Sequence, residues 1–282
     1  NPTNNRTAVG ATETTTFNIN VTDASSASVS NATTTVVSTS INDAPVLSTG
    51  VGSQAINDNQ TINPFTAFTI TDADPDQALS VVVDVSDATH GYFTTSSTNA
   101  SGFSRVADTL YIFFGTASQA QAAIRLLDFS PYNNSFAVGN TQSSTFTVGV
   151  ADFFADPVYD AATGVVVTSI NDAPTIGDAV ASQAVNDNAT LAPFASLTIA
   201  DVDPNQAVTV TVTPDAIAKG TFTSESVSVS GFTASDTDWT FTGTASQAQT
   251  AIRQLIFNPT NNRTAVGATE TTTFNINVTD AS

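Results

Sequence analysis

The chain consists largely of short segments in which apolar and polar residues alternate, separated by turn residues. Phe17–Val21 reads Phe-Asn-Ile-Asn-Val, and the same five letters recur at Phe274–Val278. Such alternation puts every second side chain on one face and is typical of a half-buried β-strand. The same pattern predicts further strands at Phe68–Ile70, Leu79–Val85, Thr109–Phe114 and Gly164–Ser169. Strands spaced about ten residues apart, with turns between them, predict an all-β sandwich.

Two segments depart from this alternation and carry a helical pattern. Thr116–Gln119 reads Thr-Ala-Ser-Gln, a capping box, and apolar residues follow it at helical spacing as far as Leu127. Residues 244–255 repeat the pattern. We therefore expect each domain to carry one short helix, packed on the sandwich through Ile124 or Ile252.

Internal repeats predict the domain boundaries. Residues 1–25 and 258–282 are identical letter for letter. A weaker period lies inside this one, because Ile41–Pro45 reads Ile-Asn-Asp-Ala-Pro and returns at 170–174. Self-similarity of this kind marks repeat architectures. The predicted parts are the C-terminal part of a preceding repeat (1–45), a complete repeat (46–174) and a repeat that lacks its last strand (175–282).

Two arrangements complete the partial repeats, and the sequence leaves both open. The chain is either an interior window on one continuous tandem polypeptide, or a subunit whose N-terminal segment docks head to tail into its neighbour. The second route is donor-strand complementation, in which residues 26–40 supply the strand that 175–282 lack. In either arrangement the expected partners are neighbouring repeats of the same protein.

Composition excludes several classes of function. The 282 residues include 25 Asp or Glu against 6 Lys or Arg, for a formal net charge of −19. This charge argues against nucleic acid and anionic membranes as partners. No apolar run approaches the roughly 18 residues of a membrane span, so no membrane insertion is expected. The absence of cysteine excludes disulfides and thiolate chemistry.

The acidic residues recur in a fixed order along each repeat. A D-x-D-P segment, an Asp that closes the Phe-rich strand, and an Asn-Asp-Ala-Pro linker appear in turn. The D-x-D-P segments contain Asp72, Asp74 and Asp76 in one repeat and Asp201 and Asp203 in the other. The strand-end acids are Asp23, Asp152 and Asp280, and the linkers contain Asn42–Asp43 and Asn171–Asp172. In an extended segment, residues i and i+2 face the same way, so the carboxylates of a D-x-D can converge on one cation. Ca²⁺ takes roughly 6–8 oxygen ligands of this kind. The alternative for each Asp is a turn residue that accepts bonds from its own backbone.

In this order the motifs resemble the cadherin repeat and, more closely, the cadherin-like (VCBS/Ig-like) tandem repeats of giant bacterial surface adhesins. The family's A-x-D-x-D segment is matched by Thr69–Asp74, its strand-end V-x-A-x-D loosely by Ile19–Asp23, and its D-x-N-D-N-x-P linker by Ser40–Pro45. The resemblance implies tandem sandwiches with calcium at their junctions and an extracellular or cell-surface location. The implied ligands are Asp23, Asn42, Asp43, Asp72 and Asp74, with Asp76 as a further candidate, at the first junction, and Asp152, Asn171, Asp172, Asp201 and Asp203 at the second.

Individual residues outside these motifs have simpler interpretations. His90 precedes Gly91 and is expected to be a surface loop residue and not a catalytic base; it has no counterpart in the second repeat, where Lys219 precedes Gly220. Trp239 occupies the place of Tyr111 in the other repeat and is expected to pack in the core or half-buried on a strand; the alternative is a platform for a sugar ring.

The expected function is structural. We expect a calcium-stiffened repeat of a giant extracellular bacterial protein that acts as an extender, stalk or fibre in adhesion or a biofilm matrix. The alternative is a polysaccharide- or cell-binding adhesin module, which would display an exposed aromatic or polar patch in each repeat. We do not expect an enzyme, because a catalytic carboxylate pair rarely recurs at every domain boundary.

Overall fold

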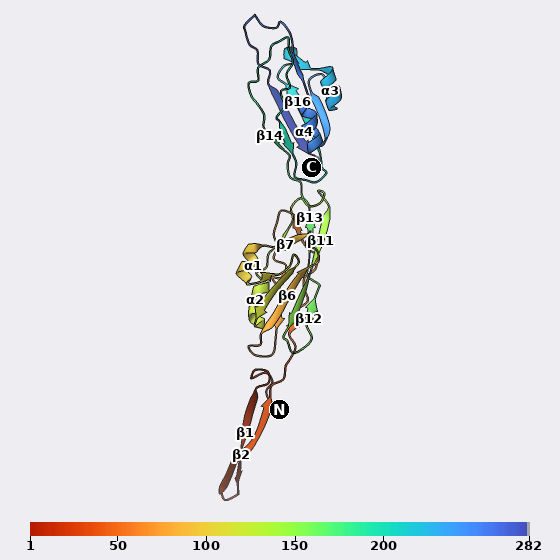
Figure 1. Cartoon of the computed structure of the whole chain (residues 1–282). Helices are drawn as coiled ribbons and strands as arrows, with labels where there is room; N and C mark the ends of the chain where they lie inside the picture. Colours follow the sequence, from red (N-terminus) through yellow and green to blue (C-terminus); the bar gives the residue numbers. More distant parts are fainter. Residues whose placement is uncertain (281–282) are drawn as a thin grey trace. The chain divides into compact units, whose positions relative to one another are not determined.

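The structure, a computed structural model, describes residues 1–280 and divides into two compact units (Figure 1). The first unit comprises residues 1–133 and 141–168, and the second comprises 134–140 and the described residues from 169 onward. Strands dominate both units, which confirms the predicted β-rich class. Over residues 1–280, none of the helices combines the length and the apolar character needed to cross a bilayer.

The first unit begins with an antiparallel hairpin. Strands β1 (Thr12–Thr22) and β2 (Ser28–Thr39) pair from Thr12↔Thr39 to Thr22↔Ser28 and form a two-stranded sheet of their own. Asp23 stabilises the turn, because its Oδ1 accepts hydrogen bonds from the N–H groups of Ser25 (2.8 Å) and Ala27 (2.9 Å).

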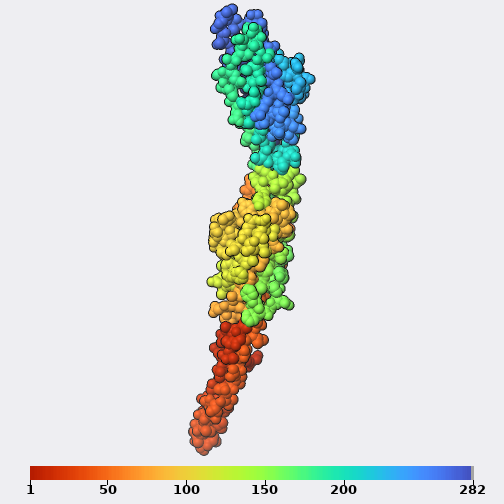
Figure 2. Space-filling model, in the orientation of Figure 1, coloured from red at the N-terminus to blue at the C-terminus, as the bar shows by residue number. Residues whose placement is uncertain are grey.

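Apolar side chains of this hairpin remain in solvent. Figure 2 shows its atoms, in red, uncovered on the face in view. Phe17 is 49% exposed and Val37 is 61% exposed. The alternation of apolar and polar residues in this segment therefore forms strands, but its apolar side chains are not buried, as they usually are on one face of an antiparallel sheet.

The main sheet of the first unit has seven strands. Its order is β4 (Gln54–Asn57), β13 (Gly164–Thr168), β11 (Thr141–Ala151), β6 (Leu79–Val85), β9 (Leu110–Gly115) and β8 (Ser104–Arg105), with β12 (Val158–Asp160) paired to β11. Strand β11 pairs with β13 through residues 141–145 and with β6 through 146–151. Strand β13 therefore lies between β11, which is antiparallel to it, and β4, which is parallel.

Shorter pairs and two helices complete this unit. Strand β3 (Val46–Leu47) pairs with β5 (Ile70–Thr71), and β7 (Gly91–Phe93) pairs with β10 (Phe129–Pro131). Helix α2 (Ala117–Ile124) is the predicted one, and α1 (Thr95–Ser101) is additional.

The prediction of one helix per domain was therefore wrong. Helix α1 was missed because its sequence, Thr-Ser-Ser-Thr-Asn-Ala-Ser, has no apolar periodicity. It is defined by its ends instead: Thr94 accepts a bond from the N–H of Ser97, and Gly102 closes the helix at φ 79°. In the second unit, α3 (Ser224–Ser230) repeats this arrangement between Thr223 and Gly231.

The core of the first unit combines the inner faces of β6 and β11 with a cluster of rings. The side chains of Val81 and Val83 are fully buried. Phe146 packs edge-on against Phe65 and Phe129, with ring centroids 5.6 Å and 5.1 Å apart. Such pairs add to the free energy gained by burying each ring.

The second unit repeats this plan with fewer strands. Its elements are β14 (Thr175–Gly177), β15 (Thr198–Ala200), β16 (Ala207–Pro214), the 3₁₀ helix Ile217–Lys219, β17 (Gly220–Phe222), α3, β18 (Thr233–Ala234), β19 (Trp239–Thr244), α4 (Ala245–Arg253), β20 (Phe257–Pro259) and β21 (Phe274–Asp280). Its main sheet runs β18-β19-β16-β21. Trp239 and Tyr111 are both buried, as predicted, and Trp239 packs edge-on against Phe222 at 4.9 Å.

Both predicted capping boxes are present. The Thr116 hydroxyl accepts from the N–H of Gln119 (3.4 Å), whose side-chain oxygen accepts from the N–H of Thr116 (2.9 Å). Thr244 and Gln247 repeat the exchange at 3.3 Å and 2.9 Å. Each exchange satisfies two backbone donors at the start of a helix.

Replacing the capping hydroxyl should weaken the first unit. We expect Thr116→Ala to lower the free energy of unfolding by about 1 kcal/mol, because one N–H at the start of α2 loses its acceptor. The control is Thr116→Ser, which keeps the hydroxyl and should remain close to wild type. Urea unfolding followed by fluorescence and circular dichroism measures both, and equal losses in the two variants would contradict the capping role.

Candidate metal centres

The linker Asn42–Asp43 is bound to the first unit through carboxylates. Asn42 Nδ2 donates to Asp152 Oδ2 at 2.9 Å, and Gln77 Nε2 donates to Asn42 Oδ1 at 2.7 Å. The backbone N–H of Asp43 donates to Asp74 Oδ2 at 2.7 Å. Asn42 and Asp43 are therefore both bonded to the part of the unit that carries the main sheet.

Strand register explains why Asp152 reaches this linker. Ala151 at the end of β11 pairs with Ser80 near the start of β6, so Asp152 emerges beside the loop that carries Asp74 and Gln77. The Oδ1 atom of Asp152 accepts from the N–H groups that follow it, those of Phe154 (2.9 Å) and Ala155 (2.8 Å). These bonds leave Oδ2 facing Asn42.

The D-x-D segment presents oxygen atoms that lack hydrogen-bond partners. The N–H of Asp74 donates to Asp72 Oδ1 at 2.9 Å, and Asp74 is only 4% exposed. The atoms Asp72 Oδ2, Asp74 Oδ1 and Gln77 Oε1 are buried without a hydrogen bond. A buried acceptor without a donor is costly, and a cation is one way to satisfy it.

These oxygens fit a hard cation, since Ca²⁺ binds carboxylate and amide oxygens. As the side chains stand within residues 1–280, no group of three or more Asp, Glu or His residues is drawn together closely enough to hold a metal.

The electrostatics of the first cluster are unfavourable without a counter-charge. Burial raises the pKa of Asp72 above its ordinary value, and the carboxylates of Asp74, Asp152 and Asp43 raise it further, against one N–H bond. Burial also opposes ionisation of Asp152, but bonds from the Ala155 N–H and the Asn42 side chain outweigh it and lower the pKa of that carboxyl. The charged form of Asp152 is therefore favoured, whereas the charged form of Asp72 is disfavoured by burial and by its acidic neighbours. A nearby cation favours the charged form of a carboxylate.

The second unit repeats the arrangement. The equivalent residues are Asn171, Asp172, Asp201, Asp203, Gln206 and Asp280. Asn171 Nδ2 donates to Asp280 Oδ2 at 3.0 Å, and the N–H of Asp172 donates to Asp203 Oδ2 at 2.7 Å. Gln206 Nε2 donates to Asn171 Oδ1, as Gln77 does to Asn42. The buried atoms Asp172 Oδ2 and Asp201 Oδ2 have no hydrogen-bond partner.

The structure brings most of the predicted residues together in two clusters, but the strand-end acids lie elsewhere than predicted. It brings together Asn42, Asp43, Asp72 and Asp74 in the first cluster, and Asn171, Asp172, Asp201 and Asp203 in the second. Asp152 belongs with the first cluster, and Asp23 lies in the hairpin turn at the far end of β2 from Asn42. Asp76 is an exposed turn residue at φ 57°.

The difference arises because each strand-end acid stays with its own unit. The prediction paired this acid with the D-x-D of the next repeat, whereas the β11–β6 ladder places it beside the D-x-D of the same repeat. Gln77, Gln206 and Asp280 were not predicted as site residues. A signal was available for each: both glutamines follow the D-x-D-P segment at the same distance, and Asp280 closes the third copy of the Phe-rich strand.

Neither a protein-family model nor a curated protein matches this chain.

The raised pKa of Asp72 predicts a pH dependence of stability in calcium-free buffer. The folded state holds a proton on Asp72 at pH values where the unfolded chain has released it. The associated stability is therefore fully present below the ordinary pKa of 3.8 and is lost as the pH rises through the raised value. We expect Asp72→Asn to remove this decline.

Urea unfolding between pH 3.5 and pH 7 tests this expectation. The exposed Asp236→Asn serves as a control and should retain the wild-type decline. If Asp72→Asn and wild type lose stability in parallel over this range, burial of Asp72 does not govern its ionisation.

Proposed function

We propose that the chain is a calcium-stiffened structural repeat of a giant extracellular bacterial protein, acting as an extender, stalk or fibre in adhesion or a biofilm matrix. In this proposal the two units belong to a tandem array of cadherin-like sandwiches. Calcium binds at the linkers between repeats, and the chain performs no catalysis.

The observation that carries the proposal is the recurrence of one oxygen-rich arrangement at both linkers. In each case a linker Asn bonds a strand-end Asp, and a linker N–H bonds the second Asp of the D-x-D segment. Turn formation alone accounts for single Asx bonds, such as that from Asp74 N–H to Asp72. It does not account for buried carboxylate oxygens without donors at equivalent places, Asp72 Oδ2 and Asp201 Oδ2.

A mechanism for stiffening follows from these contacts. Bound Ca²⁺ would supply positive charge and bring the carboxylates of Asp72, Asp74 and Asp152 together, with Asp43 as a fourth candidate ligand. The linker backbone is already held by the Asp43 N–H, so neutralising the repulsion among these acids would fix the linker against the unit. Without the ion, that repulsion would loosen the same attachment. Near-identical repeats suit an extender, which needs length more than variety.

Calcium should stabilise the folded chain through these two clusters. At a free calcium concentration of about 100 times the dissociation constant, one site should add about 2.7 kcal/mol to the free energy of unfolding. We expect the double variant Asp74→Asn, Asp203→Asn to lose this gain. Thermal and urea unfolding with calcium or EDTA measure the stability, and small-angle scattering reports whether the linkers stiffen.

The control is Asp23→Asn, which makes the same type of substitution once, in the hairpin turn, and should leave the calcium response unchanged. A wild-type chain with the same melting temperature and scattering profile in calcium and in EDTA would refute the proposal. Loss of the calcium response in Asp23→Asn would instead place that residue among the ligands.

One feature favours the second candidate function, binding of a polysaccharide. The first unit has a groove of about 590 Å³ whose lining includes Tyr92, Arg105 and Tyr132. The two tyrosine rings lie 5.4 Å apart, tilted by 42°. Rings with an apolar face and a polar edge suit a sugar surface. The second unit has Thr221 and Thr260 at the equivalent places, so the tyrosine pair does not recur in each repeat as an adhesin module would require, and polysaccharide binding stays the second candidate.

If this groove binds sugar, Tyr92→Thr should reduce the affinity at least severalfold, because it removes one ring of the pair. Tyr159→Thr, at an exposed tyrosine outside the groove, is the control. Glycan-array binding followed by calorimetry on any retained glycan provides the measurement. The second candidate fails if no glycan is retained or if the two variants lose equal affinity.

A further inference from the structure

The main sheet of the first unit turns an apolar surface toward solvent on strands β8, β9, β6, β11 and β12, and we call this surface the outer face. The buried valines of β6 point into the core, so alternation turns Val82 to the opposite side. Val82 pairs with Ile112 of β9 on one side and with Gly149 of β11 on the other. Gly149 in turn pairs with Tyr159 of β12, which is 70% exposed, and Phe114 on the same face is 68% exposed. The solvent side of an antiparallel sheet is normally polar, so these side chains need an explanation.

The second unit carries the equivalent strands with a polar surface in the same place. Thr211 of β16 pairs with Thr240 of β19 where Val82 pairs with Ile112. The outward residues of these strands and of β21 are threonines and asparagines, and they include Thr209, Thr211, Thr240, Thr242, Asn275 and Asn277. The fold therefore does not require an apolar outer face, and the first unit has one for another reason.

A glycine allows the Tyr159 ring to lie across the sheet. A Cβ atom at Gly149 would lie 2.8 Å from this ring, so a side chain there would displace it. The other two copies of the strand have Asn20 and Asn277 at this place. The ring therefore covers β11 and extends the apolar surface from Val82 to β12. Contiguous apolar patches in solvent mark interaction sites.

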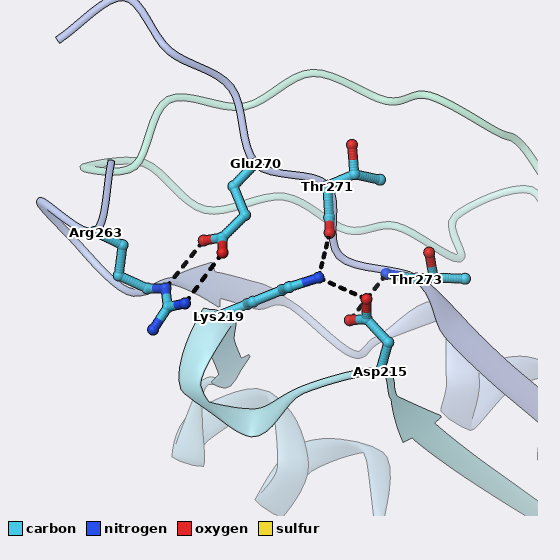
Figure 3. A network of polar contacts seen from close by, with 6 residues as sticks. All are labelled: Asp215, Lys219, Arg263, Glu270, Thr271 and Thr273. Atoms are coloured by element: carbon cyan, nitrogen blue, oxygen red, sulfur yellow. Dashed lines mark hydrogen bonds and ion pairs between the residues drawn. The ribbon is translucent and has the colours of Figure 1, made fainter. Parts of the chain in front are cut away.

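Charge limits the ways in which two copies of this chain can meet. The formal net charge is −19, and the six basic side chains are bonded within the chain. Figure 3 shows two of them: Lys219 Nζ lies 2.6 Å from Asp215 Oδ2, and Arg263 binds both carboxylate oxygens of Glu270 at 3.0 Å. The other four are Arg6, Arg105, Arg125 and Arg253. A contact between copies must therefore use a surface with few acids, because few bases are available to neutralise them.

The outer face meets this requirement and is large enough for such a contact. Among the outward residues of its five strands, all of which the structure describes, only Asp84 carries a charge. With the usual strand spacings the face measures about 24 Å across the strands and about 20 Å along them. Two such faces in contact would bury about 1,000 Å² in total, the size at which specific interfaces begin.

The same face offers little to a sugar. Apart from Asp84 and the Tyr159 hydroxyl, its outward polar side chains are the hydroxyls of Ser80, Ser104 and Thr147. Ligand sites of that kind need several polar groups that converge on one place. The apolar row around Val82 instead matches a second apolar surface, since contact between the two removes both from water.

We infer that the outer face of the first unit binds the same face of a second copy of this chain. A two-fold axis along the row from Ile112 to Tyr159 brings like residues together, Val82 against Val82 and Ile112 against Ile112. The same axis places each Asp84 opposite Ser80 of the other copy, so the two carboxylates stay apart. The contact needs no cation, and this interface is therefore separate from the calcium proposal.

The second unit supplies the substitutions that test this contact. We expect the wild-type chain to associate with rising concentration. The double variant Val82→Thr, Ile112→Thr should weaken association by roughly tenfold or more, because each copy loses two apolar side chains from the contact. The second unit folds with Thr211 and Thr240 at these places, so the variant should retain the wild-type circular dichroism spectrum.

The control is the double variant Val229→Thr, Ile217→Thr, which changes the same two residue types at exposed places in the second unit. Its association should stay within about twofold of wild type, because neither residue lies on the outer face.

Sedimentation equilibrium in EDTA and in calcium measures this association. A wild-type chain that is monomeric in both buffers, or equal effects of the two double variants, would overturn the inference. Glycan-array binding that Val82→Thr, Ile112→Thr abolishes would assign the face to a sugar and would also overturn it. Association that persists in EDTA would support the contact even if calcium binds nowhere on the chain.

Cross-linking can identify the faces in contact, since the chain has no cysteine. Stacked sheets lie about 10 Å apart, so a short bis-maleimide is needed to join two cysteines across the axis. We expect Ile112→Cys to yield covalent dimers, because the two copies of this residue meet at the axis. Thr240→Cys, at the equivalent place in the second unit, is the control and should remain monomeric. Equal yields of dimer from the two variants would contradict pairing through the outer face.

Discussion

The candidate sites depend on the antiparallel pairing of β11 with β6 and of β21 with β16. This pairing buries alternate valines such as Val81 and Val148 and leaves polar neighbours outside. A shift of one residue would exchange the two faces, so burial enforces the register. The same register brings Asp152 to the linker Asn42, and Asp280 to Asn171. The apolar core therefore positions the acidic clusters, although no apolar residue belongs to either one.

Burial gives these clusters their chemical character. An exposed aspartate cluster would be screened by water and salt. Asp74 and Asp152 are almost completely removed from solvent, and the pKa of Asp72 is raised by burial and by its neighbours. The linker amides offset part of this cost by bonding Asp152 and Asp74. The attachment between linker and unit thus depends on the hydrogen bonds that the carboxylates of Asp152 and Asp74 accept.

Many elements could be predicted from the sequence because their causes are local. Alternation identified β6 and β21, and the Thr-Ala-Ser-Gln segments identified the starts of α2 and α4. Helix α1 could not be found by periodicity, since its seven residues lack an apolar stripe and are defined by the caps Thr94 and Gly102. The recurrence of the D-x-D and linker motifs in a fixed order suggested that they meet, and the bond from the linker N–H to the second Asp joins them in both units.

The sequence by itself determined the repeat, the strand alternation and the types of residue available to bind a cation. Identical letters also showed that residues 1–25 and 258–282 have the same pairing preferences. Only the tertiary structure decided which carboxylates meet, because Asp152 and Asp74 are far apart in the chain and are joined by sheet register. It likewise decided the partners of the two copies of the repeated strand, because β1 pairs with β2 whereas β21 pairs with β16. Pairing is a relation between two segments, so the sequence of either segment alone cannot specify it.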